Sequence, residues 1–121
     1  MTTPRRKAER RGRKAEAIAL WFLRLKGYRL LQKRFKTGGG EVDLVMRRGE
    51  VTAFIEVKER QSVDEAIAAV TDRQSRRISA AARSWMARDR IAAGGVCRFD
   101  IVAISPYHWP RHIENAFYGD D

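Results

Sequence analysis

One stretch decides the fold: Gly40-Glu41-Val42-Asp43-Leu44-Val45-Met46-Arg47-Arg48-Gly49-Glu50-Val51-Thr52-Ala53-Phe54-Ile55-Glu56-Val57-Lys58. Two apolar runs flank the turn Arg48-Gly49-Glu50, an arrangement typical of a β-hairpin. Side chains alternate between the two faces of a strand, so Asp43 takes the more polar face of the first run. Glu56 and Lys58 share one face of the second run.

The type of turn sets which residues of the hairpin face each other. If Gly49-Glu50 is a two-residue type II′ loop, Arg48 faces Val51 and Asp43 faces Glu56. Cβ atoms of antiparallel partners lie about 5 Å apart, so two facing carboxylates repel each other unless a positive charge lies between them. A slip of one residue would move the carboxylates apart.

This pair of carboxylates has two interpretations. A divalent cation would relieve the repulsion, and Mg²⁺ characteristically binds one or two carboxylates together with substrate phosphates. Lys58, one step along the same face, could carry charge to a phosphate or orient an attacking water. The alternative is that Asp43, Glu56 and Lys58 form only the solvated face of the hairpin.

The rest of the chain is predicted as a mixed α/β domain. Apolar residues at helical spacing predict one helix over residues 13–26 and another that begins at Thr71, where Gln74 fits a capping box. Residues 28–35 and 96–104 have the pattern of further strands. The order α-β-β-β-α-β indicates a sandwich with a mixed β-sheet flanked by helices.

Composition limits the function classes. The 121 residues are expected to form one domain, and a net charge of +10 favours a nucleic-acid partner over a generally basic soluble protein. The single cysteine, Cys97, excludes internal disulfides and a cysteine-based zinc site. His108 and His112 flank Pro110 and are expected to be surface residues. No apolar run suits a membrane span or a signal segment, so we expect a cytoplasmic protein without a membrane partner.

Basic residues gather at two places. Residues 1–14 hold seven of them, so we expect a flexible basic arm over residues 1–12 and a single domain over residues 13–121. Arg13 and Lys14, next to the arm, could grip phosphates without reading sequence. Three arginines near the start of the second helix are either plain surface charge or further phosphate contacts: Arg73, Arg76 and Arg77.

The hairpin also resembles a known nuclease motif. Asp43 in a Gly-Glu-Val-Asp run, followed by Glu56-Val57-Lys58 at the end of the next strand, is similar to PD-(D/E)xK. The surrounding segments resemble the YraN family of small bacterial proteins, which is related to archaeal Holliday-junction resolvases. Over roughly residues 12–104 the matching segments are Arg13-Lys14-Ala15-Glu16, Gly27-Tyr28, Gly40 to Leu44, Phe54 to Lys58, Ala69-Val70-Thr71 and Arg98-Phe99-Asp100.

The resemblance implies a restriction-endonuclease-like fold and a metal-dependent endonuclease that hydrolyses DNA phosphodiester bonds, with branched DNA as one candidate substrate. Asp43 and Glu56 would bind Mg²⁺ or Mn²⁺, with Glu16 of the first helix joining the site and the Val57 carbonyl as a further ligand. Lys58 would orient or deprotonate the attacking water, or stabilise the charge that develops on the phosphate.

Two more residues are candidates for this site. Many family members have lysine where this chain has Gln74, so the charge is absent, although the amide could still bind a water or a phosphate. Helix capping is the equally favoured role for Gln74. Glu41 lies one pair from Asp43 on the same face and is a second-line candidate.

Two functions of other classes stay open. One is a non-catalytic DNA- or RNA-binding protein that retains the nuclease fold, whose binding would depend on salt. The other is an adaptor whose basic surface meets an acidic protein. A homodimer is expected only by analogy with the archaeal resolvases.

Overall fold

The computed structural model describes residues 4–117, with side chains from residue 12 onward. Nine elements follow one another within residues 4–117: α1 (Pro4–Leu25), β1 (Arg29–Lys36), β2 (Glu41–Arg48), β3 (Val51–Glu59), α2 (Val63–Ala68), α3 (Asp72–Met86), α4 (Arg90–Gly94), β4 (Val96–Ile104) and β5 (Arg111–Ile113).

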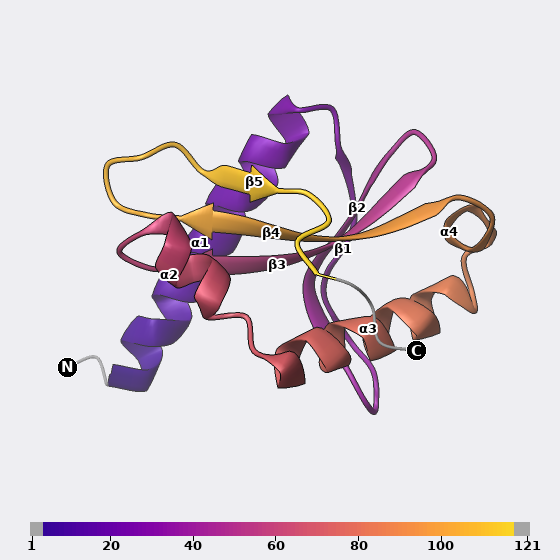
Figure 1. Ribbon diagram of the computed structural model, residues 1–121, viewed down its shortest axis with the longest axis horizontal. Helices are drawn as coiled ribbons and strands as arrows, with labels where there is room; N and C mark the ends of the chain where they lie inside the picture. The colour runs from indigo at the N-terminus through magenta and orange to yellow at the C-terminus, as the bar shows by residue number, and fades with distance from the viewer. Residues whose placement is uncertain (1–3, 118–121) are drawn as a thin grey trace.

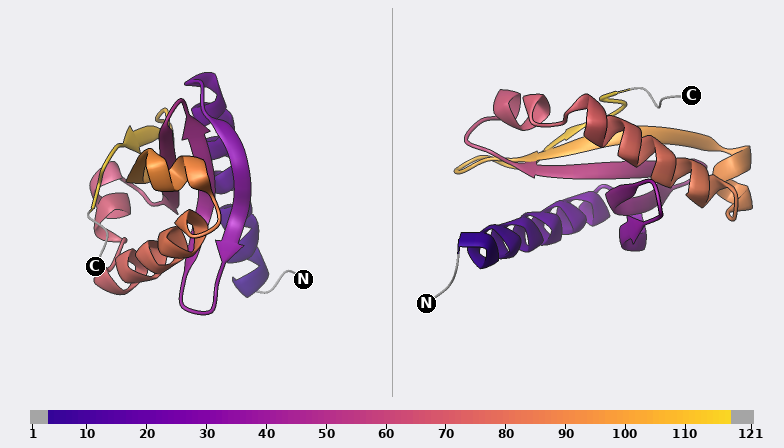
Figure 2. Two further views of the ribbon diagram at one scale, coloured as in Figure 1. Left: turned by 90° about the vertical axis from the view of Figure 1, so that its right-hand side faces the viewer. Right: turned by 90° about the horizontal axis from the view of Figure 1, so that it is seen from below.

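The five strands form one sheet in the order β1-β2-β3-β4-β5 (Figure 1). Strands β3 and β4 are parallel, whereas the other neighbours are antiparallel. Helix α1 covers one face of the sheet and α3 covers the other, as the view from below shows (Figure 2). The predicted mixed α/β sandwich is therefore confirmed.

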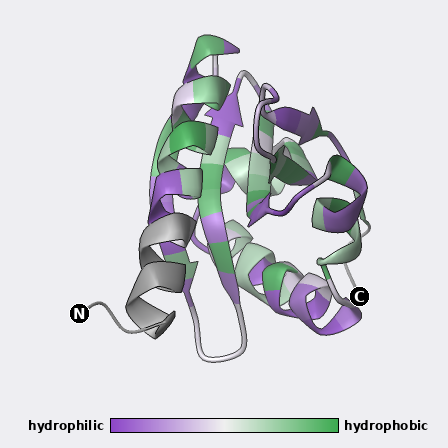
Figure 3. Ribbon diagram, turned by 90° about the vertical axis from the view of Figure 1, so that its left-hand side faces the viewer, coloured by the Kyte–Doolittle hydropathy of each residue, from purple (hydrophilic) through white to green (hydrophobic). Residues whose placement is uncertain are grey.

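Each face of the sheet has its own apolar core. On the α1 side, Leu23 packs with strand residues that include Leu44 and Ile55. On the α3 side, Ile78 packs with strand residues that include Phe54. Hydrophobic segments accordingly run along the strands, while α3 alternates hydrophobic and hydrophilic residues (Figure 3). The alternation of the hairpin thus places its two strands between the two helices.

The first helix is longer than predicted. It begins at Pro4 instead of Arg13, so residues 4–12 continue the helix rather than forming a separate arm. Proline suits the first turn of a helix, and the arginines, lysine and alanine that follow have high helix propensity. Residues 1–3 of the expected arm lie outside the described residues. Among those that are described, no helix is both long and apolar enough to cross a membrane.

A buried polar cluster fastens β5 to the sheet, and it corrects the expectation that His112 is a surface residue. The His112 side chain is only 1% exposed, and its Nε2 lies 2.7 Å from Oδ2 of the fully buried Asp100. Lys26 Nζ lies 2.6 Å from His112 Nδ1. Because an ammonium group only donates, Nδ1 accepts this bond and Nε2 carries the proton donated to Asp100.

The same cluster joins the segments around Tyr28 and Arg98. The guanidinium of Arg98 donates to both carboxylate oxygens of Asp100 and also to the hydroxyl of Tyr28. Burial opposes the charge on Asp100, but hydrogen bonds from His112, Arg98 and the backbone of Asn115 outweigh it and lower the pKa of this carboxyl. These contacts give Tyr28, Arg98 and Asp100 a structural role.

Candidate functional site

The observed hairpin register agrees with the predicted one. Arg48 pairs with Val51, and the regular β2–β3 pairing continues to Leu44 and Ile55. Beyond that pair, the backbone N–H of Val57 donates to Oδ2 of Asp43 at 2.8 Å. The Asp43 side chain therefore bonds to β3 where regular backbone pairing with β2 stops, and a cavity opens at this point.

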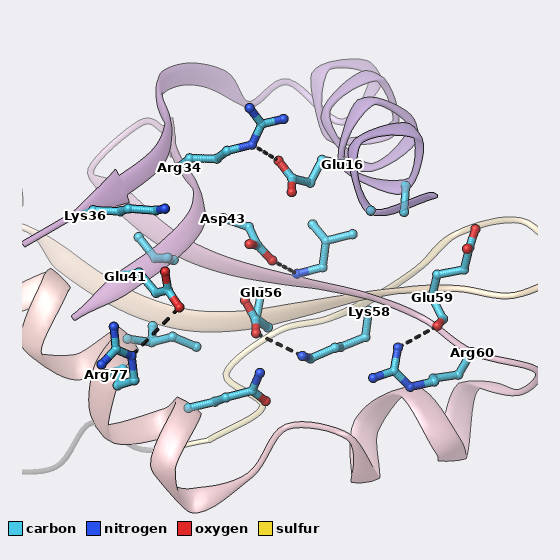
Figure 4. Close-up of a pocket in the computed structure, with 16 residues that line it drawn as sticks. Glu16, Arg34, Lys36, Glu41, Asp43, Glu56, Lys58, Glu59, Arg60 and Arg77 are labelled. Carbon is cyan, nitrogen blue, oxygen red and sulfur yellow. Dashed lines mark hydrogen bonds and ion pairs between the residues drawn. The ribbon is translucent and has the colours of Figure 1, made fainter. Parts of the chain in front are cut away.

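The cavity has a volume of about 610 Å³ and lies between α1, α3 and the ends of the hairpin strands. Figure 4 shows Asp43, Glu56 and Lys58 side chains gathered at its centre, with Glu16 and Arg34 on one side and Arg77 on the other. All six of these residues line the cavity. The structure thus brings the predicted hairpin residues and the predicted helix glutamate into one site.

Asp43 and Glu56 form a close carboxylate pair. Burial, together with a hydrogen bond to Glu56 and its negative charge, raises the pKa of Asp43 to about 8. The Val57 N–H and the charge of Lys58 act in the opposite direction but are weaker. Two charged carboxylates this close together repel each other, so the site favours the protonated form of Asp43 at neutral pH.

Lys58 supplies the nearest positive charge to this pair. Its Nζ lies 3.3 Å from Oε2 of Glu56, and both side chains are largely buried. Because Lys58 also lines the cavity, its ammonium group contributes positive charge there. Together, Asp43, Glu56 and Lys58 have the residue types and the placement predicted from the hairpin.

Glu16 lines the cavity but is partly committed elsewhere. Nε of Arg34 donates to its Oε1 at 3.1 Å. Burial, and then the negative charge of Asp43, raise the pKa of Glu16 despite the opposing effect of Arg34. The influence of Asp43 shows that the two carboxylates belong to one electrostatic site. No sequence pattern indicates a role for Arg34, because β1 meets α1 only in the folded chain.

Gln74 both lines the cavity and caps its helix. Its backbone N–H donates to Oγ1 of Thr71 at 3.2 Å, while its Oε1 accepts from the backbone N–H of Thr71 at 3.3 Å. This is the predicted capping box, and it occupies the amide oxygen. The helix-capping role of Gln74 is therefore confirmed. Because Gln74 also lines the cavity, its amide group lies near the site.

Glycine lets α3 approach the start of β2 closely. A Cβ atom on Gly40 would lie 2.1 Å from the carbonyl oxygen of Arg77 and 2.7 Å from the backbone nitrogen of Ala81. The neighbouring Glu41 is half exposed, and its Oε1 lies 3.8 Å from Nε of Arg77. Close packing at Gly40 therefore brings Arg77 to the cavity wall, where Glu41 pairs with it.

Positive side chains surround the cavity. Arg13 and Lys14 are exposed on α1, next to the cavity residues Ala15 and Glu16. Arg73 and Arg76 are exposed on the first turns of α3, near the cavity residue Arg77. Sequence analysis missed two further cations that line the cavity, Lys36 and Arg60. Lys36 ends β1 and Arg60 follows β3, and the sequence pattern did not indicate that both positions border one cavity.

The carboxylates suit a divalent cation that also binds its substrate. Within residues 12–117, no group of three or more His, Cys, Asp or Glu side chains is arranged to hold a metal ion. Asp43 and Glu56 nevertheless match the one or two carboxylates that Mg²⁺ uses alongside substrate phosphates. A cation bound to both carboxylates would relieve the repulsion between them.

Comparisons with known proteins agree on one family. Residues 15–104 match the protein-family model described as "Uncharacterised protein family UPF0102". A UPF0102 protein of Methylobacterium nodulans is 52% identical over 93% of this chain and 88% of its own length. One from Methylorubrum extorquens is 50% identical over the same shares, and one from Mesorhizobium japonicum is 49% identical over 95% of this chain and 92% of its own.

Proposed function

This chain belongs to the uncharacterised protein family UPF0102, and we propose that it is a metal-dependent endonuclease that hydrolyses phosphodiester bonds of DNA. The observation that carries the proposal is the Asp43–Glu56 carboxylate pair, which lies in a cavity beside Lys58. The likeness of these three residues to the PD-(D/E)xK motif supports the same reaction.

The proposed site needs Mg²⁺ or Mn²⁺ at Asp43 and Glu56. Such an ion supplies a bound water that is easier to deprotonate and a positive charge for the phosphate oxygens. Asp43 and Glu56 would hold it as carboxylate ligands, with the Val57 carbonyl as a further candidate. Glu16, in the same cavity, would accept a hydrogen bond from a water at the site.

The remaining side chains would position the phosphate. Lys58 would stabilise the negative charge that grows on the phosphate oxygens, because its ammonium group is already held inside the cavity. Arg77 and Arg60 would bind neighbouring phosphates at the cavity wall. The exposed cations of α1 and α3, which include Arg13 and Arg76, would hold the strand on either side without reading its sequence.

The test is cleavage of supercoiled, linear and four-way-junction DNA in Mn²⁺, in Mg²⁺ and in EDTA. We expect the wild-type protein to cut in the presence of metal, Asp43→Asn to lose cutting, and the exposed-site control Asp64→Asn to keep it. Preferential cutting of the junction would assign branched DNA as substrate. Equal DNA binding by wild type and Asp43→Asn, with no cutting by either, would contradict the proposal and favour a non-catalytic DNA-binding protein.

A further inference from the structure

The loop between β4 and β5 displays two aromatic side chains to solvent. It reads Ser105-Pro106-Tyr107-His108-Trp109-Pro110. Tyr107 is 103% exposed and Trp109 is 75% exposed, the highest values for large hydrophobic side chains in the described part of the chain. Exposing two such side chains on one short loop is unfavourable in water, so a binding role needs to be considered.

The backbone at Tyr107 is also strained. Its φ of 63° lies in the left-handed region, which a bulky residue rarely adopts. Pro106 followed by a positive φ is the arrangement at the centre of a type II turn, where the second position is normally glycine or asparagine. A tyrosine at this position costs stability, and strain of this kind is concentrated at ligand-binding sites.

This loop leaves the sheet next to the candidate site. Lys58 pairs with Ala103 across the parallel strands β3 and β4, and the backbone N–H of Arg60 donates to the carbonyl of Ile104 at 3.0 Å. Tyr107 follows Ala103 by four residues, a reach of at most about 14 Å. Figure 1 shows β3 and β4 ending at the same side of the sheet, with the loop continuing outward from there.

Two exposed cations belong to the segments that adjoin this loop. Arg60 lines the cavity, and Arg111 follows the loop on β5. Aromatic faces interleaved with positive charge suit a single nucleic-acid strand, because each unpaired base offers a π face while its phosphates meet the cations. A blunt duplex keeps its bases stacked inside and offers no such face.

We propose that Tyr107 and Trp109 stack on unpaired bases of a DNA strand whose phosphate backbone reaches the Asp43–Glu56 site. The substrate class is then DNA with a single-stranded segment beside the bond to be cut. This inference rests on the proposed function, since it takes the cavity to be the place where the phosphate binds.

The test measures DNA binding without cleavage, by fluorescence anisotropy in EDTA. The probes are a labelled single-stranded oligonucleotide and its blunt duplex, and the proteins are wild type, the double variant Tyr107→Ser/Trp109→Ser, and Trp21→Ser. Trp21 is a matched control because its indole is also exposed, at 56%, but lies on α1. Stacking on one base is worth about fivefold to 150-fold in affinity. We therefore expect the affinity of the double variant for the single strand to fall by at least about tenfold, and its affinity for the duplex to stay almost unchanged.

Three results would overturn the inference: an unchanged affinity of the double variant for the single strand, an equal loss on both probes, or an equal loss in Trp21→Ser. In each case the wild type still binds DNA, so the proposed function stands. If the wild type bound neither probe, the proposed DNA substrate would fail together with the inference. Because Tyr107, Trp109 and Trp21 are all exposed, we expect the double variant and Trp21→Ser to have the circular dichroism spectrum of the wild type.

Discussion

The backbone N–H of Val57 donates to the carboxylate of Asp43 at 2.8 Å, just past Leu44 and Ile55, the last regular pair of β2 and β3. A side chain thus takes up a β3 donor at the point where regular strand pairing ends. The bond orients Asp43 toward Glu56 in the cavity and explains why two carboxylates can be kept together. It also makes the charge state of Asp43 the variable that links stability, metal binding and pH.

Replacing Asp43 with asparagine should stabilise the fold. Burial and Glu56 raise the pKa of Asp43 from its ordinary value of 3.8 to about 8, so the folded state prefers its protonated form. Protonated Asp43 makes its full contribution to the free energy of unfolding below about pH 4, and this contribution is lost as the pH rises through about 8. We expect Asp43→Asn to be more stable than wild type by on the order of 2 kcal/mol at pH 8, and by less at pH 5.

Urea unfolding of the two proteins at both pH values measures this difference. Asp64→Asn is the control, because that carboxylate is exposed on α2 and should show no such pH-dependent gain. A destabilised Asp43→Asn at pH 8 would mean that the carboxylate pair is a structural feature rather than a strained site.

Metal binding should release a proton below pH 8. A cation at Asp43 and Glu56 would displace the proton that the raised pKa keeps on Asp43, so its affinity should rise by up to about tenfold per pH unit and level off above pH 8. Titration calorimetry with Mn²⁺ between pH 6 and pH 9 measures both the affinity and the protons released. Affinity that does not change over this range would place the ion elsewhere.

Lys58 should affect turnover far more than metal binding. Its Nζ lies 3.3 Å from Oε2 of Glu56 inside the cavity, and under the proposed function its charge would act on the phosphate. We expect Lys58→Met to lower kcat by about 100- to 1000-fold, the usual loss for one group that stabilises transition-state charge, with Mn²⁺ affinity retained. Lys33→Met, at an exposed position of β1, is the control. A comparable loss of Mn²⁺ affinity would instead assign Lys58 to the assembly of the carboxylate pair.

Asp100 should be a stability residue without a part in the reaction. It is fully buried and binds Arg98, His112 and the backbone of Asn115, so Asp100→Asn leaves a buried cation without its counter-charge. We expect a loss of about 3–5 kcal/mol in urea unfolding at pH 7. Since the pKa of Asp100 is lowered, the difference in the free energy of unfolding between the wild type and Asp100→Asn should disappear as the pH falls below about 4.

The matched control for Asp100 is Glu114→Gln. Glu114 is 47% exposed and lies 3.8 Å from the same Arg98, so its loss should change stability by less than about 0.5 kcal/mol. Similar effects of the two substitutions would contradict the role assigned to the buried cluster.

Of the three consecutive glycines before β2, only Gly40 should be intolerant of alanine. Its Cβ would meet the backbone of α3 at 2.1 Å, whereas nothing lies within 4 Å of a Cβ on Gly38 or Gly39. We expect Gly40→Ala to cost at least about 2 kcal/mol, because backbone atoms of a packed helix cannot move aside cheaply. Thermal unfolding of Gly39→Ala, expected to match the wild type, provides the comparison. A neutral Gly40→Ala would mean that α3 is not packed so closely here.

The sequence by itself determined the hairpin and the centre of the site. A two-residue turn and strict alternation fix the register over a short stretch of chain, and this was enough to predict that Asp43, Glu56 and Lys58 share a face. The order of the main elements and the capping box of α3 followed from equally local patterns. Local patterns succeed here because the interacting residues are close along the chain.

Only the tertiary structure decided which distant residues meet. The bond between Lys26 and His112 spans 86 residues, and no local pattern indicated that His112 would be buried. Arg34 reached Glu16, and Arg60 reached the cavity wall, only because the sheet order and the two covering helices brought separate segments together. The exposed, strained Tyr107 is also a product of the fold, since the loop must join β4 to the short antiparallel β5. Periodicity fixes which face a side chain takes, whereas chain topology fixes its neighbours.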